Sequence, residues 1–241
     1  MDCFKSCPFK YKLRYVDRLK VLQDYEPNNP LLIGTMLHNA VEVGIEKAEY
    51  KYFKNYPIIN DYHIDEVIKV EAMSNKVRKI LTDRKVAFEY KLNTSDFIGY
   101  IDCVEMLKDG TFALYDFKYS NNVSNYDKSA QIHLYKYFFE QQTGEKVSKL
   151  AYIMVPKLST QRKFNDDVQA FRRDLKRELA RKEAFIHRVT YSSNKVITWL
   201  LDLKRCMEAT EYPKNETRLC YYCDYYDYCQ KGIDFNVITK K

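Results

Sequence analysis

Two acidic residues and one lysine are spaced so that a β-hairpin would gather them on one face. Asp102 and Asp116 lie equally far from Asp109, the middle residue of a Lys-Asp-Gly turn signal between two apolar runs. With a three-residue turn, Asp102 faces Asp116, and directly opposed residues point to the same face. Lys118 shares that face because side chains alternate along a strand. A two-residue turn would shift the register by one and separate the set.

Two neighbouring carboxylates and an amine suggest metal chemistry on phosphate esters. Carboxylates pushed together repel one another unless a cation lies between them. Hard oxygen ligands select Mg²⁺ or Mn²⁺, which polarises a phosphodiester and generates hydroxide from bound water. A lysine beside such a site stabilises the charge that develops on phosphorus. The alternative is a surface salt-bridge ladder in which Asp102 and Asp116 both pair with Lys118, and the hairpin alone does not decide between the two.

The elements that would position these residues alternate between helices and strands. The hairpin belongs to a three-strand meander that follows helices and precedes a helix and a further strand, which predicts an α/β fold with a mixed central sheet flanked by helices. Gly144 marks the end of the helix after the meander. The predicted helices are Phe4–Arg18, which Pro8 interrupts early, Leu32–Phe53, Ile64–Arg84, Lys128–Gln142, Asp166–Lys182 and Asn194–Ala209. The predicted strands are Val86–Leu92, Ile98–Leu107, Thr111–Tyr119, Lys149–Val155 and Phe185–Tyr191.

The composition is that of a globular protein without a membrane span. The chain has 241 residues, 46% hydrophobic and 30% charged, enough to bury a core as one domain. No apolar run approaches the roughly 20 residues that cross a bilayer, and the polar, cysteine-rich N-terminus is unlike a signal peptide. We therefore expect no membrane partner and a reducing cytoplasm, where the seven cysteines are thiols or metal ligands. A net charge of +7 suits a polyanionic partner without requiring one.

Four blocks, in order and at similar spacing, resemble the RecB-type nucleases of the PD-(D/E)xK superfamily. The segments Gly99-Tyr-Ile-Asp102 and Leu114-Tyr-Asp116-Phe-Lys118-Tyr-Ser120 are similar to that group's "G-x-I-D … D-x-K-x-S" core. Upstream, Gly34-Thr-Met-Leu-His38-Asn-Ala-Val-Glu42 resembles its "G-x-x-x-H-x-x-x-E" helix. Downstream, Gln131-Ile-His-Leu-Tyr135 resembles its "Q-x-x-x-Y" helix. The resemblance implies a restriction-endonuclease-like core.

The resemblance also implies a divalent-metal site beside a catalytic lysine, Lys118. A lone histidine such as His38 is most often a satisfied core side chain, but the pattern of its helix favours a ligand. The implied ligands of Mg²⁺ or Mn²⁺ are His38, Asp102, Asp116 and the backbone carbonyl of Phe117.

Other polar residues are expected around that site. Gln131 and Tyr135 are one turn apart on one helix face, so both can lean over the site. The resemblance implies that these two residues position the substrate. Glu42 is either a residue behind the ligands or helix surface, and Glu89, on the preceding strand, is a weaker candidate for a supporting acid.

The cysteines near the C-terminus predict a second metal site. Cys220, Cys223 and Cys229 form a C-x2-C-x5-C run, which needs a fourth ligand to close a tetrahedral site or a cubane cluster. The N-terminus offers Cys3 and Cys7. Unliganded thiols are the alternative, and Cys103 and Cys206 are expected in the core.

The resemblance favours Cys7 as the fourth ligand. Phe4-Lys-Ser-Cys7-Pro8 is similar to the "Y-x-x-C-P" opening of the iron–sulfur branch of RecB-type nucleases, which includes the CRISPR-associated adaptation nuclease and the AddB nuclease domain. It implies a structural [4Fe–4S] cluster, with Zn²⁺ as the alternative. Such a cluster would join segments 1–30 and 210–241 around a nuclease core of residues 31–209, since closing a long loop removes unfolded-chain entropy.

These features together predict a metal-dependent DNA exonuclease that trims single-stranded ends. Basic runs at Lys5–Lys20, Arg162–Lys163 and Arg172–Lys182 would track phosphates, although a solvated surface explains them as well. The alternatives are a nuclease partner of a helicase, because the chain has no Gly-rich P-loop of its own, and a non-catalytic nucleic-acid-binding module. Partners in CRISPR adaptation or recombination both fit, and the Lys-, Asn- and Tyr-rich usage is compatible with a virus-encoded protein in a host cytoplasm.

Overall fold

The computed structural model describes residues 2–22, 26–95, 97–232 and 237–238. The chain forms two compact units, one made of residues 25–193 and the other of residues 1–24 and 194–241. Parts of the expected cluster-binding segments, at residues 1, 23–25, 233–236 and 239–241, lie outside the described residues. The two units are taken in turn.

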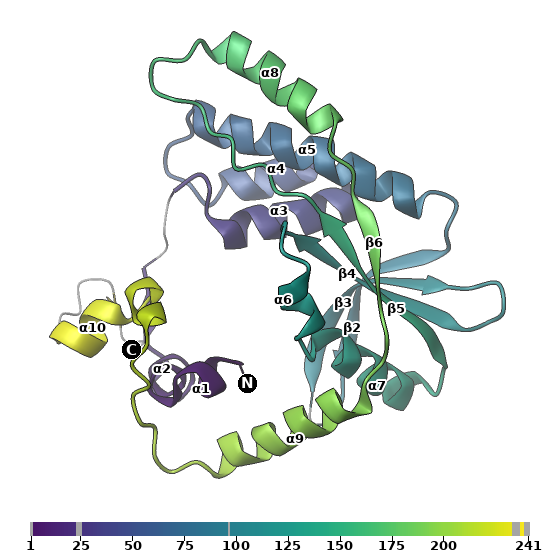
Figure 1. Cartoon of the computed structure of the whole chain (residues 1–241), viewed down its shortest axis with the longest axis vertical. Coiled ribbons are helices and arrows are strands. Elements are labelled where there is room, and N and C mark those ends of the chain that lie inside the picture. Colours follow the sequence, from purple (N-terminus) through teal and green to yellow (C-terminus); the bar gives the residue numbers. More distant parts are fainter. Residues whose placement is uncertain (1, 23–25, 96, 233–236, 239–241) are drawn as a thin grey trace. The chain divides into compact units, whose positions relative to one another are not determined.

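The larger unit is built on a mixed five-stranded sheet (Figure 1). Strands β2, β3 and β4 form an antiparallel meander, β4 and β5 are parallel, and β5 and β6 are antiparallel. The parallel connection runs through helices α6 and α7, as a parallel pair requires. The strands are β2 Val86–Asn93, β3 Ile98–Met106, β4 Phe112–Tyr119, β5 Val147–Val155 and β6 Phe185–Val189. The predicted α/β class with a helix-flanked mixed sheet is therefore confirmed.

Helices cover both faces of this sheet. Ile33, Met36 and Leu37 of α3 pack with residues of α5 and α8 against Cys103, which is fully buried, and its neighbours on one face. On the other face, Phe139 of α7 packs against aromatic rings of β2 and β4. The helices are α3 Pro30–Val43, α4 Ile45–Phe53, α5 Asp61–Leu81, α6 Ser124–Asp127, α7 Gln131–Thr143 and α8 Val168–Ala180.

One predicted helix is in fact two. The single helix expected at Leu32–Phe53 is wrong, because α3 ends at Val43 and α4 begins at Ile45. Between them Gly44 has φ 94°, a backbone conformation that glycine adopts without a steric penalty. The break leaves α3 as a separate helix, which Asn29 caps by accepting from the N–H of Leu31 at 3.0 Å.

The hairpin between β3 and β4 has the predicted register. Cys103 pairs with Tyr115 and Met106 with Phe112, and continuing this register by one residue sets Asp102 opposite Asp116. The three-residue turn prediction is confirmed, since the N–H of Leu107 donates to the carbonyl of Thr111 at 2.8 Å. The turn chemistry of the sequence thus places the two acids at matching positions.

The smaller unit contains short elements and one long helix. Its described core is a cluster of Leu13, Leu19 and Tyr225, whose hydroxyl donates to the carbonyl of Leu19 at 2.8 Å. The helix expected at Phe4–Arg18 has its predicted interruption, because α1 ends at Ser6 and α2 begins at Pro8, but the segment finishes in a π-helical turn, Lys12–Val16, before Arg18. The remaining elements are α1 Asp2–Ser6, α2 Pro8–Tyr11, β1 Lys20–Val21, α9 Ser193–Glu208, a 3-10 turn Arg218–Tyr222, α10 Tyr226–Lys231 and β7 Val237–Ile238, which pairs with β1. Among the described residues, no helix has the length and hydropathy needed to cross a membrane.

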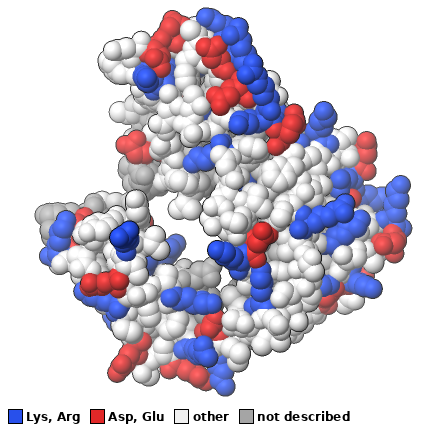
Figure 2. All heavy atoms as spheres, in the orientation of Figure 1, with Lys and Arg blue, Asp and Glu red and all other residues white. Residues whose placement is uncertain are grey.

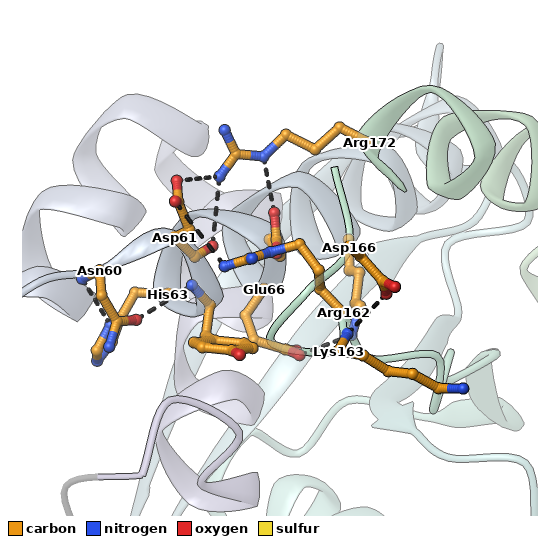
Figure 3. Close-up of polar contacts among 11 residues, drawn as sticks. Asn60, Asp61, His63, Glu66, Arg162, Lys163, Asp166 and Arg172 are labelled. Carbon is orange, nitrogen blue, oxygen red and sulfur yellow. Dashed lines mark hydrogen bonds and ion pairs between the residues drawn. The ribbon is translucent and has the colours of Figure 1, made fainter. Parts of the chain in front are cut away.

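A buried charge network joins α8 and the loop before it to α5 (Figure 3). The Arg172 guanidinium of α8 donates to Asp65 at 2.7 Å and to Asp61 at 2.9 Å. Arg162 of the preceding loop lies 3.5 Å from the other oxygen of Asp65. The Asp65 side chain is only 4% exposed and lies between two arginines that Asp61 also approaches, so two carboxylates balance two guanidinium groups.

We expect Asp65→Ala to destabilise the protein by about 3–5 kcal/mol, because it removes the buried acid and leaves two largely buried arginines with only the partly exposed Asp61 as partner. Denaturant unfolding followed by circular dichroism measures this. Asp174→Ala is the matched control, since Asp174 pairs with Arg177 on the exposed face of α8, and it should change stability by less than about 0.5 kcal/mol. Equal unfolding midpoints for the two variants would show that the network does not hold α8.

Candidate functional site

The two acids of the hairpin lie where strands β3 and β4 separate. The ladder of paired residues ends at Cys103 and Tyr115, one position before Asp102 and Asp116. Instead of a strand pairing, the Asp102 carboxylate accepts the backbone N–H of Phe117 at 2.6 Å. Asp102 is 8% exposed and Asp116 only 1%. Both carboxylates are therefore held in a place with little water.

Helix α3 brings a histidine to the same point. His38 Nδ1 lies 3.3 Å from Asp102 Oδ1 and 4.0 Å from Glu89 Oε1. Its ring meets the ring of Phe117 edge-on, with centroids 5.6 Å apart. One ligand atom from each of His38, Glu89 and Asp102 lies within 4.8 Å of the others. A single cation can contact all three.

Glu89 reaches this group through an unusual backbone conformation. It has φ 49°, although it lies inside strand β2 and is not a glycine. The β2–β3 ladder pairs Phe88 with Cys103 and Tyr90 with Ile101 but skips Glu89 and Asp102. A left-handed non-glycine residue costs about 1–3 kcal/mol and persists only where the surroundings enforce it.

The lysine of the hairpin is tied to a short chain of polar groups. Lys118 Nζ lies 2.6 Å from Asp116 Oδ2 and donates to Gln131 Oε1 at 2.9 Å. The amide of Gln131 in turn donates to the Tyr135 hydroxyl at 2.9 Å. The side chains of Asp116 and Lys118 are 2% and 17% exposed, so this pair is not a rung of a surface salt-bridge ladder.

Burial and crowding raise the pKa values of this group. Burial, with the nearby charge of Asp102, raises the pKa of Asp116 to about 7, against the opposing effect of Lys118. Burial lowers the pKa of His38, but its hydrogen bond to Asp102 and the surrounding acids outweigh this and leave the pKa raised. Burial and the charge of Asp102 also raise the pKa of Glu89. All three groups therefore hold protons more tightly than they would in water.

These residues fit a divalent cation. Glu89, Asp102 and Asp116 bring three negative charges, and Lys118 supplies one fixed positive charge, so two charges remain uncompensated. The donor set of carboxylate oxygens and one imidazole nitrogen suits Mn²⁺ and, through its oxygens, Mg²⁺. Asp116 is not part of the group within 4.8 Å, since Lys118 holds its Oδ2. A bound cation would compete with Lys118 for that oxygen.

The smaller unit has a cavity lined by cysteines. Its volume is about 290 Å³. Among the residues that the structure describes, Cys3 does not line it, although Cys7 does. Burial and the nearby Cys7 and Cys223 thiols raise the pKa of Cys229, whereas Lys214 lowers it. The four lining cysteines are Cys7, Cys220, Cys223 and Cys229.

Some residues of the site escaped sequence reasoning or were given little weight. Glu89 was only a weak candidate, since its position opposite Asp102 depends on the β2–β3 register, which no turn signal specifies. The rings of Tyr126 and Tyr152 lie 5.3 Å and 5.7 Å from Lys118 Nζ, and nothing in their spacing indicated this. Glu42 is half-buried and lies near Glu89, but it does not belong to the group of His38, Glu89 and Asp102.

The basic residues do not define a groove. Lys and Arg side chains line one edge of α8 at the top of the view (Figure 2). Arg173 and Lys176 are exposed there, but Asp174 on the same helix pairs with Arg177. The surface is therefore mixed in charge, and the arginines Arg162 and Arg172 are engaged by acids of α5.

Comparison with known proteins assigns a family. The family model described as "PD-(D/E)XK nuclease superfamily" matches residues 1–230. No curated protein matches the chain. Among solved structures, one titled "Crystal structure of SSO0001" aligns over 86% of this chain and 98% of its own, with 10% identity and a TM-score of 0.37. Those two values are too low to support a shared fold by themselves.

Protons and a divalent cation should compete for the site. Asp116 and His38 have raised pKa values, so the metal-free folded protein binds protons that the unfolded chain releases. Asp116 makes it less stable as the pH rises from about 4 to about 7, and His38 does so as the pH rises above about 6.5. A cation displaces those protons, so Mn²⁺ should raise the melting temperature more at about pH 8 than at about pH 5.5.

Thermal unfolding with and without Mn²⁺ at the two pH values measures this competition. At free Mn²⁺ about 100 times Kd the expected stabilisation is about 2.7 kcal/mol. Asp116→Asn is the control, because it removes both the titrating group and one ligand charge and should make the Mn²⁺ effect smaller and less dependent on pH. If Mn²⁺ raised the melting temperature of the wild type equally at both pH values, protons and the cation would not compete for the site.

Proposed function

The chain belongs to the PD-(D/E)XK nuclease superfamily, whose members are metal-dependent phosphodiesterases, and from this premise we propose that it is a DNA exonuclease that trims single-stranded ends. The observation that carries the proposal is the buried Asp116–Lys118 pair beside the His38, Glu89 and Asp102 group. A non-catalytic binding module has no need of three acids around one lysine that compensates only one of them.

Each residue of the site has a role in this proposal. His38, Asp102, Asp116 and the Phe117 carbonyl hold Mg²⁺ or Mn²⁺, and a cation bound there would polarise the phosphodiester and activate a water molecule. Lys118 stabilises the charge that develops on the phosphate oxygens. The two remaining positioning residues, Gln131 and Tyr135, are hydrogen-bonded to each other.

The ligand set has support from the contacts of the site. Asp102 cannot rotate freely, because the Phe117 N–H holds one of its oxygens at 2.6 Å while the other lies 3.3 Å from His38. Gln131 holds Lys118 from the side opposite Asp116. Groups fixed in this way need little reorganisation when charge develops, which is where most catalytic stabilisation arises.

We also propose that the cysteine cavity holds a [4Fe–4S] cluster with a structural role. Its support is the convergence of Cys7 with the C-terminal cysteines on one cavity of about 290 Å³. A tetrahedral four-cysteine Zn²⁺ site is the alternative.

The preference for free ends and the partners rest on resemblance. The iron–sulfur branch of RecB-type nucleases suggests single-stranded or ended DNA as substrate. A helicase supplied by another polypeptide, or proteins of CRISPR adaptation or recombination, would then deliver that DNA. The fold itself hosts both exonucleases and endonucleases, so the products must decide between them.

We expect anaerobically purified protein with Mn²⁺ or Mg²⁺ to degrade end-labelled single-stranded DNA stepwise. Asp116→Ala should abolish cleavage without loss of DNA binding, and Lys118→Ala should slow it by about 100- to 1000-fold. Lys108→Ala is the matched control, because it removes the same charge from an exposed position of the same hairpin. Cleavage of circular DNA would indicate an endonuclease. DNA binding without any cleavage by the wild type would favour the binding module.

We expect the isolated protein to contain iron and acid-labile sulfide in equal amounts and to absorb visible light. Cys7→Ser should lose both, because Cys7 lines the cavity, whereas Cys3→Ser should retain them. Metal analysis together with absorbance checks this. Zinc in place of iron, or iron retained in Cys7→Ser and lost in Cys3→Ser, would overturn the assignment.

A further inference from the structure

The ammonium of Lys118 has four neighbours, of which the site described so far uses two. Asp116 and Gln131 are its polar partners, at 2.6 Å and 2.9 Å. The other two are aromatic rings, with centroids 5.3 Å away for Tyr126 and 5.7 Å away for Tyr152. A cation within about 6 Å of a ring face is attracted by the ring's quadrupole, more strongly where water is scarce.

The two rings contact each other at a tilt of 49°. Their centroids are 5.6 Å apart, and the Tyr152 hydroxyl donates to the carbonyl of Tyr126 at 3.3 Å. Tyr152 is fully buried in β5, next to Asp116 in the strand register. The buried side chain of Tyr152 therefore holds Tyr126 in place.

Tyr126 differs from the rest of its segment. Helix α6, which follows β4 (Figure 1), is otherwise polar, and Ser124, Asn125 and Asp127 are exposed while Tyr126 is half-buried. Asp127 lies 2.7 Å from His187 of β6, which holds the segment from its outer side. The ring of Tyr126 contacts both Tyr152 and Lys118.

A bound cation makes this contact more important, and this step rests on the proposed function. When a divalent metal shares the Asp116 carboxylate, it draws that charge away from Lys118. Lysine has a flexible four-carbon side chain and a point charge, so it moves readily when its partner weakens. Gln131 and the two rings are then what keeps the ammonium in place.

We propose that Tyr126 is a positioning residue, whose ring, with Tyr152, seats the Lys118 ammonium beside the phosphodiester while the metal occupies Asp116. In this proposal the aromatic ring of Tyr126 positions Lys118, and its hydroxyl is not needed. Helix α6 carries that ring.

The kinetic test separates ring from hydroxyl. Tyr126→Phe should keep kcat within about twofold of wild type, and Tyr126→Leu should lower kcat about tenfold with KM and Mn²⁺ affinity unchanged. Tyr50→Leu is the matched control, because Tyr50 lies 4.5 Å from Lys54 in an exposed lysine–tyrosine pair on α4 and should have no effect. An unchanged kcat in Tyr126→Leu, an effect on KM alone, or a Tyr126→Phe variant as slow as Tyr126→Leu would each overturn the proposal.

A spectroscopic test does not depend on cleavage. Reductive ¹³C-methylation keeps the lysine charge, and the methyl signal that Lys118→Arg removes belongs to Lys118. That signal should be displaced by ring currents in wild type and Tyr126→Phe, and should move part of the way toward the position of exposed lysines in Tyr126→Leu, where only the Tyr152 ring remains. A Lys118 methyl signal that does not change in Tyr126→Leu would overturn the proposed positioning. If the wild type shows the ring-dependent signal but cleaves no DNA, the proposed function is wrong while the positioning of Lys118 by Tyr126 still holds.

Discussion

The mutual repulsion of three acids facing one lysine is the constraint on which the larger unit depends. Glu89, Asp102 and Asp116 come from three successive strands, and Lys118 compensates only one of them. Asp102 and Asp116 are buried, so water screens their charge little, and the crowding of acids raises the pKa values of Asp116 and of the more exposed Glu89. The folded chain accommodates that charge with protons or with a divalent cation, so stability and metal binding draw on the same carboxylates.

The sheet is distorted where this group forms. Strands β3 and β4 stop pairing at Cys103 and Tyr115, and the Asp102 side chain takes the N–H that a strand would have used. One strand away, Glu89 has a left-handed backbone that costs about 1–3 kcal/mol. Such distortion at a group of ligands is the usual price of a preorganised site, and the helices packed on the other residues of the sheet enforce it.

Local signals predicted a large part of this architecture. The Lys-Asp-Gly turn specified the hairpin register, and Gly144, with φ 74°, ends α7 where the glycine indicated. The same kind of signal was missed at Gly44, where an apolar stripe continued past a residue that stops the helix. Near the N-terminus, the helical segment breaks at Pro8 as predicted, and Pro8 begins α2 because proline is tolerated in a first helical turn.

The sequence by itself determined the fold class, the opposition of Asp102 and Asp116, and the side of the strand on which Lys118 lies, because turn type and strand alternation are local properties. Only the tertiary structure decided which groups from distant elements meet them. His38 reaches Asp102 through the packing of α3 on the sheet, and Glu89 reaches the same point through a strained backbone. Such contacts depend on how helices and strands pack together, which residue spacing along the chain does not encode.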